Sequence, residues 1–585
     1  MSWLSYCYKT YQNSVSEIGK QQPGKVPLLP VAHTTQQVNI EVELDKDGNF
    51  QYAGLLAQDQ RTTIIPCTEE SSARTSGMVP HPLVDKLQYI AADYPTFGGS
   101  KESGWPLYHK QLQAWCTSPY AHPAVCTVLH YLEKECLIAD LVKANILFID
   151  ENGTLPTKWQ GNKEDKPPIL DTLTGSDQTE SFVRFRVDNV DLSRDTTVRE
   201  SFIRFYETQL KDIDYCTVQG IKMPISTLSP YKIRNPGDRA KLISSNDNTN
   251  YTYRGRFADA AQALSIGYET TQKAHSALRW LVSKQGVNTG DQTVLVWGTQ
   301  NEAVPNVLGD TLDIAQEYNP LAGDDWDDFE EDTERLPADT QEEIARQFNR
   351  AILGYQHQLK DNSQTAVMIL DSATPGRLSI RYYQELQGSK LLANIKDWHD
   401  AFQWQLEYRS VEEPTELGKK PKIKKVVFVG APAPADIAKA AYGEKVDAKL
   451  KQATIERLIP CITNGERFPR DLMISAVDRA TNSIGLDYWE QQKTQNIACA
   501  LVRGYYHRNK KVDYPMNVDE TIKDRNYLFG RILACAEQIE RRALIQLGNE
   551  SEKRLTNAER LRTAFALHPA ATTLLLDKKL NPYLN

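Results

Sequence analysis

The chain has 585 residues and a mass of 66.2 kDa, with 40% hydrophobic and 25% charged residues. This length exceeds what one hydrophobic core usually supports, and the composition excludes wholesale disorder, so we expect several folded domains. The formal net charge is −8. No apolar run is long enough to cross a bilayer, and the N-terminus lacks a signal-peptide pattern, so we expect a cytoplasmic protein without membrane contact.

The N-terminal part mixes helical and strand-like patterns. Apolar spacing predicts a short helix over residues 3–18. The alternating run 38–44, a turn ending at Gly48 and the run 49–52 predict a β-hairpin. Helical spacing dominates residues 110–144, and strands are expected over 181–187 and around 215–222.

The remaining chain adds strands and then becomes helical. We expect a helix over residues 259–284 and strands over 293–297, 365–370 and 377–383. Beyond Gly430 the pattern is helical throughout, and the clearest helix spans residues 524–547. One face of that helix carries Leu528, Ile532, Cys535, Ile539 and Ala543. On another face, Glu537 and Arg541 can pair.

These patterns predict an α+β fold, with a mixed α/β N-terminal body and a C-terminal all-helical bundle. The expected divisions are an N-terminal α/β domain over residues 1–320, an acidic loop or linker over 321–345, a continuation of the body over 346–430, and the bundle over 431–585. No internal repeat is visible.

The sequence lacks the motifs that enzyme chemistry usually requires. There is no phosphate loop, nucleophile elbow or H-E-x-x-H pair, and the nine cysteines form no C-x-x-C pair. We therefore expect no enzyme activity, catalytic residue, metal or cofactor. The alternative is a metal-dependent nuclease using the acidic run 324–332, although a continuous acidic run is more often a solvated loop.

Negative charge is concentrated in one segment. Residues 321–343 contain eleven acidic residues and one arginine, so the rest of the chain carries +2. Because phosphate binding depends on local potential, this distribution permits contact with nucleic acid.

Three cation-bearing regions are candidates for such contact. The loop 74–81 combines an arginine, hydroxyl groups and a glycine that allows close backbone approach. The stretch 241–279 combines polar side chains with cations, although Arg279 could belong to a core helix. The run 419–425 has five lysines in seven positions, which suits phosphate contact or an edge strand protected by charge.

Several segments along the chain together match one known family: Tyr251-Thr-Tyr-Arg-Gly-Arg-Phe257 and residues 74–81, 265–281, 376–383, 397–399, 431–436 and 441–443. In these segments the sequence resembles the large subunits of type I-C CRISPR Cascade complexes. The order and spacing of the segments agree over nearly the whole chain.

This resemblance implies a non-catalytic protein near the 5′ end of a guide RNA. Such a subunit recognises the protospacer-adjacent motif (PAM) in duplex DNA, helps unwinding and R-loop stabilisation, and offers a docking surface to a helicase–nuclease. The implied partners are CRISPR RNA, the Cascade backbone and 5′-handle-binding subunits, the small subunit, target double-stranded DNA, the displaced strand and the recruited helicase–nuclease. A purely architectural subunit that never touches target DNA is the alternative.

Candidate contacts follow from the resemblance and the cation pattern. For the motif duplex they are Arg74, Thr75, Ser76, Gly77, His81, Ser244, Ser245, Asn246, Arg254, Arg256 and Lys273. For the non-target strand or DNA backbone they are Lys419, Lys420, Lys422, Lys424, Lys425, Arg503, Arg508, Lys510 and Lys511. The resemblance also implies that the C-terminal bundle is made separately as the small subunit, and we expect Met473 to be its internal start.

Overall fold

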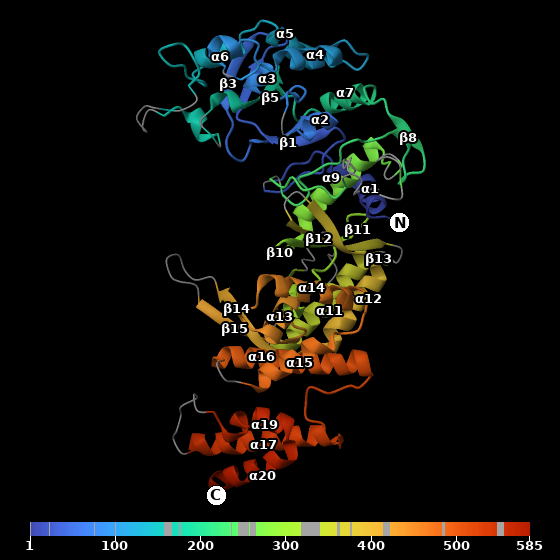
Figure 1. Ribbon diagram of the computed structural model, residues 1–585, viewed down its shortest axis with the longest axis vertical. Helices are drawn as coiled ribbons and strands as arrows, with labels where there is room; N and C mark the ends of the chain where they lie inside the picture. The colour runs from blue at the N-terminus through green and yellow to red at the C-terminus, as the bar shows by residue number, and fades with distance from the viewer. Residues whose placement is uncertain are drawn as a thin grey trace, which may run out of the picture. The chain divides into compact units, whose positions relative to one another are not determined.

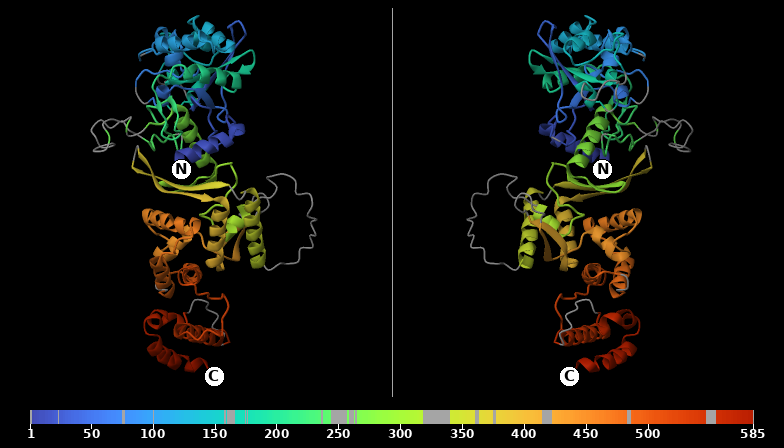
Figure 2. Two further views of the ribbon diagram at one scale, coloured as in Figure 1. Left: turned by 90° about the vertical axis from the view of Figure 1, so that its right-hand side faces the viewer. Right: turned by 90° about the vertical axis from the view of Figure 1, so that its left-hand side faces the viewer.

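The computed structural model (Figures 1 and 2) describes residues 2–22, 24–74, 77–99, 101–156, 159, 166–173, 175, 177–235, 237–243, 257, 262, 265–317, 340–359, 363–374, 377–413, 422–482, 486–546 and 555–584. The chain divides into two compact units. Unit 1 comprises Met1–Gly286, Thr299–Asn301 and Leu370–Arg381. Unit 2 comprises Val287–Gly298, Glu302–Ile369 and Tyr382–Asn585.

Unit 1 contains helices and short strands in alternation. Its helices are α1 (Trp3–Asn13), α2 (Glu69–Ser72), α3 (Leu87–Ile90), α4 (Trp105–Cys116), α5 (Pro123–Leu132), α6 (Leu137–Lys143), α7 (Thr196–Glu207) and α9 (Tyr268–Gln285). Its strands are β1 (His33–Gln37), β2 (Ile40–Leu44), β3 (Phe50–Leu55), β4 (Thr62–Pro66), β5 (Asp85–Lys86), β6 (Phe182–Val187), β7 (Val190–Asp191), β8 (Ile213–Tyr215) and β9 (Lys222–Pro224).

The main sheet of unit 1 has the order β3-β2-β6-β5, and β7 pairs with β6. Strand β2 runs parallel to β6 in a register that sets Glu41 opposite Arg184 and Glu43 opposite Arg186. On one face of the sheet, Arg184 Nε donates a hydrogen bond to Glu41 at 2.8 Å. The alternate residues of β2, such as Val42, are buried on the opposite face. The alternation in the sequence therefore separates an apolar face from a cross-strand ion-pair ladder.

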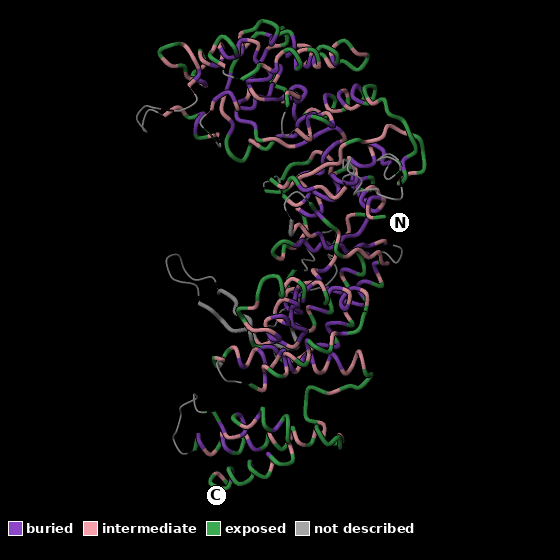
Figure 3. Tube along the Cα trace, viewed as in Figure 1, coloured by how far each residue is buried: buried purple, intermediate pink, exposed green. Residues whose placement is uncertain are grey.

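The predicted hairpin is confirmed. Strand β2 pairs antiparallel with β3, and the turn between them ends at Gly48, whose φ of +75° is accessible to glycine at little cost. Strand β6 confirms the strand expected over 181–187. The strand expected around 215–222 is instead the connection of a hairpin, because β8 ends at Tyr215 and β9 begins at Lys222. The core of unit 1, seen as buried chain in Figure 3, includes Trp115 with its ring 5.0 Å from that of Phe202.

Helix α9 begins later than the sequence pattern predicted. Its N-cap, Gly267, has extended backbone dihedrals and forms a bridge with Ile225, so the helix starts at Tyr268. The helix is almost surrounded by the fold, since eleven of its eighteen residues are buried, and it packs beside α1. This position makes Arg279 a core residue, in keeping with the alternative considered for it.

Unit 2 begins with strands and ends with helices. Its strands are β10 (Val287–Thr289), β11 (Gln292–Gly298), β12 (Gln364–Thr374), β13 (Arg377–Gln387), β14 (Trp404–Glu413) and β15 (Lys422–Gly430), with the β12–β13 tip assigned to unit 1. Its helices are α10 (Thr311–Glu317), α11 (Thr340–Gln358), α12 (Gly388–Ala401), α13 (Pro434–Tyr442), α14 (Ala448–Thr463), α15 (Arg470–Thr481), α16 (Tyr488–Tyr505), α17 (Arg525–Gln546), α18 (Asn557–Arg560), α19 (Arg562–Leu567) and α20 (Pro569–Leu580).

An aromatic cluster holds the helices of unit 2 together. The rings of Trp398 and Phe402 lie 4.1 Å apart, and Phe468 lies 5.0 Å from Phe402. Helix α16 approaches this cluster through Gly504, where a Cβ would lie 2.2 Å from the Phe402 ring. A larger residue at this position would have to push the ring aside.

The last helices form a small core of their own. Helix α17 exists as predicted, and Arg541 pairs with Glu537 at 3.4 Å. However, its side exposing Leu528, Ile532, Cys535 and Ile539 faces solvent in the structure. The buried residues are Ala536, Glu540 and Leu544, on an adjacent face of the helix. The helix is apolar over more than one face, so periodicity alone could not select the packed one.

The α+β class with a helical C-terminal region is confirmed, since every element that follows Gly430 among the described residues is helical. The two compact units divide the chain at Gly286, whereas the sequence pattern placed divisions at 320 and 430. Among the described residues, no helix combines the length and apolarity needed to cross a membrane.

Candidate nucleic-acid interface

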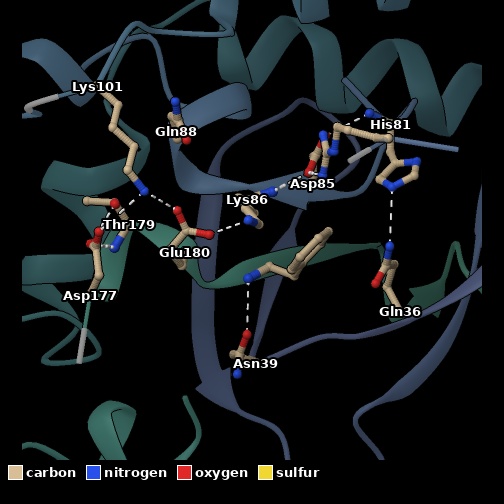
Figure 4. A network of polar contacts seen from close by, with 12 residues as sticks. Gln36, Asn39, His81, Asp85, Lys86, Gln88, Lys101, Asp177, Thr179 and Glu180 are labelled. Carbon is tan, nitrogen blue, oxygen red and sulfur yellow. Dashed lines mark hydrogen bonds and ion pairs between the residues drawn. The ribbon is translucent and has the colours of Figure 1, made fainter. Parts of the chain in front are cut away.

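A fully buried carboxylate organises the loop that begins at Arg74. Asp85, which is 0% exposed, accepts two hydrogen bonds from the Arg74 guanidinium at 2.8 and 3.0 Å. The backbone N–H of His81 adds a third bond at 2.7 Å, and that of Lys86 adds a fourth at 2.8 Å. Figure 4 shows Asp85 beside His81 and Lys86, together with the neighbouring network in which Glu180 binds Lys86 and Lys101.

Arg74 is bound on several sides. Its Nη1 also donates to the carbonyl oxygen of Val79 at 2.8 Å, and the guanidinium lies 4.5 Å from the centre of the Tyr89 ring. Burial acts to lower the pKa of Arg74, but the Asp85 carboxylate outweighs it and the pKa is raised. The arginine therefore holds the loop in shape, with only 12% of its side chain exposed.

His81 is also placed as a structural residue. It is 2% exposed, its Nδ1 lies 3.0 Å from Ser71 Oγ, and its Nε2 lies 3.3 Å from Gln36 Nε2. Burial lowers its pKa to about 4, so the ring is neutral at physiological pH and offers no charge to a phosphate.

A second buried carboxylate fixes the segment that faces this loop. Glu69, 6% exposed on helix α2, accepts hydrogen bonds from Thr227 N at 3.0 Å, Thr227 Oγ1 at 2.8 Å and Leu228 N at 2.9 Å, and also contacts Ser226 Oγ. Helix α2 leads directly to Arg74, and Leu228 leads to Tyr231. One side chain thus ties both segments together.

Between these segments lies a basic cavity, which we define by its lining residues Arg74, Val79, Tyr231, Arg239 and Lys241, together with Glu70, Ala73 and Leu228. Its volume is about 340 Å³. The structure thus brings the start of the predicted 74–81 loop next to Lys241, the first residue of the predicted 241–279 stretch. These two regions were proposed independently from the sequence.

Three cations at or beside the basic cavity form no ion pair in the described part of the chain, whereas Arg74 is paired with Asp85 and the exposed Glu70 also lines the cavity. Within the described part of the chain, no carboxylate lies at ion-pair distance from Lys232, Arg239 or Lys241. Burial, followed by the charge of Arg279, lowers the pKa of Lys232 to about 8. Burial likewise lowers the pKa of Arg279 to about 10. Because burial is the largest cause of both shifts, these values show that the charged forms of the two side chains are poorly solvated, and the charge of Arg279 adds to the shift of Lys232.

The sequence reasoning missed Lys232 and Arg239. The signal was present, since residues 232–241 contain four cations and a single acidic residue. That acidic residue, Asp238, is already used: it binds Arg234 at 3.2 Å and accepts from Ala240 N at 2.9 Å.

The other predicted motif contacts are placed as follows. Gly77 is exposed, its φ is +90°, and no heavy atom outside its chain neighbours lies within 4 Å of the place where a Cβ would be. Lys273 lines a different cavity of about 570 Å³ and forms an ion pair with Glu269. The structure therefore does not bring Lys273 to the basic cavity. Thr75, Ser76, Ser244, Ser245, Asn246, Arg254 and Arg256 lie outside the described residues.

A comparison with family models identifies the chain. The model described as CRISPR-associated protein (Cas_Csd1) matches residues 7–585. The chain belongs to the Cas_Csd1 family. This match supports a CRISPR-associated Cascade subunit. No curated protein matches the sequence.

Two of the C-terminal cations predicted to contact DNA cap helices inside this Cas_Csd1 protein. Arg503 donates to the carbonyl oxygens of Asp400 at 2.8 Å and Ala401 at 3.0 Å, at the C-terminal end of α12. Arg508, whose side chain is 6% exposed, donates to the carbonyl oxygen of Cys461 at 2.9 Å near the end of α14. Both arginines satisfy helix carbonyls that would otherwise lack donors.

Lys510 and Lys511 are different, because both are exposed. They remain available for the predicted phosphate contacts. Lys419 and Lys420 lie outside the described residues, as does the acidic run 324–332, and the side chains of Lys422, Lys424 and Lys425 on β15 are not described. No group of His, Cys, Asp or Glu in the described residues is arranged to hold a metal ion.

Proposed function

We propose that this Cas_Csd1 chain is the non-catalytic large subunit of a type I-C Cascade complex that recognises the PAM in duplex DNA. In this role it helps unwinding and R-loop stabilisation and presents a surface to the helicase–nuclease. The family match and the distributed resemblance support the complex, and the basic cavity supports contact with DNA.

The carrying observation is that two cations lining the basic cavity, Arg239 and Lys241, form no ion pair with any described residue. Arg239 is exposed, Lys241 is half-buried, and neither has a carboxylate partner in the described part of the chain. Because DNA phosphates supply the missing negative charge, binding there replaces repulsion between cations with attraction. Phosphate contacts position a protein on the duplex, and nearby loops then recognise base edges.

The geometry divides the candidate residues into two roles. Arg239 and Lys241 are proposed to contact phosphates, and Gly77 is proposed to let the loop backbone approach the duplex. Arg74 and His81 are proposed to hold that loop in position. Lys273 lines a separate cavity, and this position does not support direct contact between Lys273 and the duplex. Contact between DNA bases and the residues near 75–76 and 244–256 stays a prediction.

Crosslinking tests this proposal against the architectural alternative. Assembled complex is irradiated on a target duplex that carries a photoreactive base in the PAM, and crosslinked peptides are identified by mass spectrometry. We expect peptides from residues 73–81 or 231–256. Crosslinks confined to other subunits would favour the architectural alternative. The matched control is a duplex with the photoreactive base placed outside the target.

The absence of catalysis is tested separately. Magnesium-dependent cleavage is measured for the wild-type protein and for Asp327→Asn/Asp328→Asn. We expect no cleavage above background by either protein. Cleavage by the wild type that the double substitution abolishes would instead support the nuclease alternative.

The proposed internal start at Met473 has a structural consequence. Met473 lies within α15 and packs against the core of unit 2. A product starting there would expose Ala476 and Ala480, which are buried in the full chain. We therefore expect this product to bind a partner surface as soon as it is made. Met473→Leu should abolish the small product while Met516→Leu leaves it, and the small product persisting in Met473→Leu would exclude this start.

A further inference from the structure

The β8–β9 hairpin turns one face to the rest of unit 1 and the other to solvent. In its register Ile213 lies opposite Pro224, and Tyr215 lies opposite Lys222. Directly opposed residues of an antiparallel pair share a face, and so do alternate residues along a strand. These four side chains therefore form one surface, which we call the hairpin face. Ile213 is 65% exposed and Tyr215 is 58% exposed, so the hairpin face is open to solvent.

The opposite face anchors the hairpin. It carries Met223, whose Sδ accepts a hydrogen bond from Thr270 Oγ1 on α9 at 3.7 Å. A Cβ on Gly267 would lie 2.2 Å from the same sulfur, so the backbone before α9 fits closely against this side chain. Ser265 Oγ also donates to the carbonyl oxygen of Tyr215 at 2.8 Å. The hairpin is therefore held against the start of α9 while the hairpin face stays exposed.

The turn of the hairpin is fixed as well. Cys216, which follows β8, is 0% exposed, and its N–H donates to the carbonyl oxygen of Ile221 at 2.9 Å. Gly220 has a φ of +71°, and its N–H donates to the carbonyl oxygen of Cys216 at 2.8 Å. The Tyr215 ring is thus carried on a rigid element. A ligand that contacts this ring loses little free energy to ordering the protein.

The hairpin face combines an aromatic ring with a cation. Lys222 Nζ lies 5.2 Å from the centre of the Tyr215 ring. Lys222 is exposed and forms no ion pair within the described residues. Asp212 and Asp214 alternate with Tyr215 along the chain, so they belong to the opposite face and leave the hairpin face without a carboxylate. A flat ring beside an unpaired cation suits an unpaired nucleotide, whose base stacks on the ring and whose phosphate meets the positive charge.

A short segment joins the hairpin face to the basic cavity. Pro224 lies four positions before Leu228, which lines the cavity, and four residues span at most about 14 Å. The segment is held in place, because Thr227 Oγ1 and Leu228 N both donate to Glu69. The hairpin face is therefore close to the place where phosphates of the duplex are proposed to bind. A strand that separates from its complement at that place exposes unpaired bases near the hairpin.

We propose that the hairpin face binds one unpaired nucleotide of the displaced DNA strand, with its base stacked on the Tyr215 ring and its phosphate paired with Lys222. This inference rests on the proposed function, because it takes the nucleotide from target DNA that the complex has opened. The stacking site itself can be tested with the full-length protein and single-stranded DNA alone.

The probe is an oligothymidylate of about ten nucleotides, a usual length for a single-strand site, that carries one 2-aminopurine. This base loses fluorescence when it stacks on a ring. Affinity and fluorescence at saturation are measured over a range of sodium chloride concentrations for wild type, Tyr215→Ala, Tyr215→Phe and Lys222→Met. Tyr52→Ala is the control for loss of an exposed ring, since Tyr52 is 67% exposed on β3. Lys143→Met is the control for loss of a surface lysine, since the Lys143 side chain is 77% exposed.

Tyr215→Ala should lower the affinity by roughly 5- to 150-fold and restore the fluorescence, with the salt slope unchanged, because one stacked base is lost. Tyr215→Phe keeps the ring and should retain both the affinity and the quenching. Lys222→Met should retain the quenching, but its slope of log affinity against log salt concentration should be less steep by about 0.7, the contribution of one phosphate on a single strand. Equal affinity and fluorescence in wild type and Tyr215→Ala, or an equal loss in Tyr52→Ala, would overturn the site. An unchanged slope in Lys222→Met would overturn its pairing with phosphate.

The assembled complex then identifies the source of the nucleotide. With 2-aminopurine in the displaced strand beside the PAM, we expect quenching that Tyr215→Ala removes. With 2-aminopurine in the guide RNA, Tyr215→Ala should change nothing, and a response of the RNA label alone would refute binding of the displaced strand. Normal oligothymidylate binding by Tyr215→Ala, combined with failure to assemble with the other subunits, would make the hairpin face a protein interface and overturn the inference.

This inference and the proposed function can fail separately. Loss of Tyr215-dependent quenching as a finding, with duplex binding that still depends on Arg239 and Lys241, would refute the hairpin site and keep the proposed function. Tyr215-dependent quenching of the oligothymidylate without any binding of PAM duplex by the complex would refute the proposed function, and it would also refute the displaced strand as the source of the nucleotide.

Discussion

Replacing Asp85 with asparagine tests the role assigned to the loop that begins at Arg74. The substitution keeps the shape of the side chain but removes its charge, leaving the Arg74 guanidinium against a neutral amide in a site that is 0% exposed at position 85. The amide nitrogen of the new asparagine would also face an N–H donor from which the carboxylate had accepted a hydrogen bond. Breaking a buried, hydrogen-bonded ion pair in this way costs about 3–5 kcal/mol.

That cost should be visible in unit 1. A destabilisation of about 3 kcal/mol lowers the midpoint of a domain of this size by roughly 6–12 °C. The two units need not unfold together, so the assay combines thermal unfolding with hydrogen exchange. We expect faster exchange at the amides of His81 and Lys86, which donate to Asp85, and unchanged exchange in α16.

A double-mutant cycle with Arg74→Met isolates the pair. If Arg74 mainly holds the loop, Asp85→Asn should cost less in the Arg74→Met background, giving a coupling energy of at least about 1 kcal/mol. A destabilisation below about 1 kcal/mol by Asp85→Asn, with no coupling to Arg74, would refute this reasoning. In that case Arg74 would again be a candidate for contact with DNA.

Three further predictions follow from other residues. Arg503→Met should lower the stability of unit 2 by about 1.5–3 kcal/mol in urea unfolding, because charged hydrogen bonds to the end of α12 are lost. The control Lys510→Met, the same type of change at an exposed position, should alter the unfolding free energy by no more than about 0.5 kcal/mol. Equal effects of the two substitutions would contradict the capping role of Arg503. Since the pKa of His81 is about 4 in the fold, below its ordinary value of 6.5, the unfolded state binds more protons between these values and stability falls as the pH drops from 6.5 to 4, by up to about 3 kcal/mol. His81→Gln should therefore reduce the difference in unfolding free energy between pH 7 and 4.5, and an unchanged difference would show that His81 does not contribute. Glu69→Gln should destabilise unit 1 by about 1–3 kcal/mol and speed amide exchange at Thr227 and Leu228, whereas normal exchange there would exclude the proposed tie.

Much of the fold could be predicted because the relevant signals are local. The run 38–44 alternates, and its turn ends in a glycine with positive φ, so the β2–β3 hairpin follows from a few neighbouring residues. The helical C-terminal region is equally evident from its spacing. The packed face of α17 could not be predicted, because the choice between Leu528 and Leu544 depends on which helix packs against it.

The candidate site shows the same limit for charges. A loop arginine such as Arg74 is expected to point to solvent, and only the fold shows that Asp85 accepts it inside the protein. Arg503 and Arg508 are similar, since their carbonyl partners are distant in sequence. Counting charged residues would identify segment 232–241 as rich in cations. Its nearness to residue 74 could not be predicted, because it depends on hydrogen bonds between Glu69 and residues that lie 157–159 positions further along the chain.

The salt dependence of target binding tests the central claim most directly. Dissociation constants of the assembled complex for target duplex are measured over a range of sodium chloride concentrations, for wild type and Arg239→Met/Lys241→Met, with Lys143→Met as the control. Each phosphate contact contributes about −0.9 to the slope of log affinity against log salt concentration. The slope for the double variant should therefore be less steep by about two, while the variant still assembles with guide RNA. An unchanged slope and affinity in the double variant would contradict contact between the basic cavity and DNA.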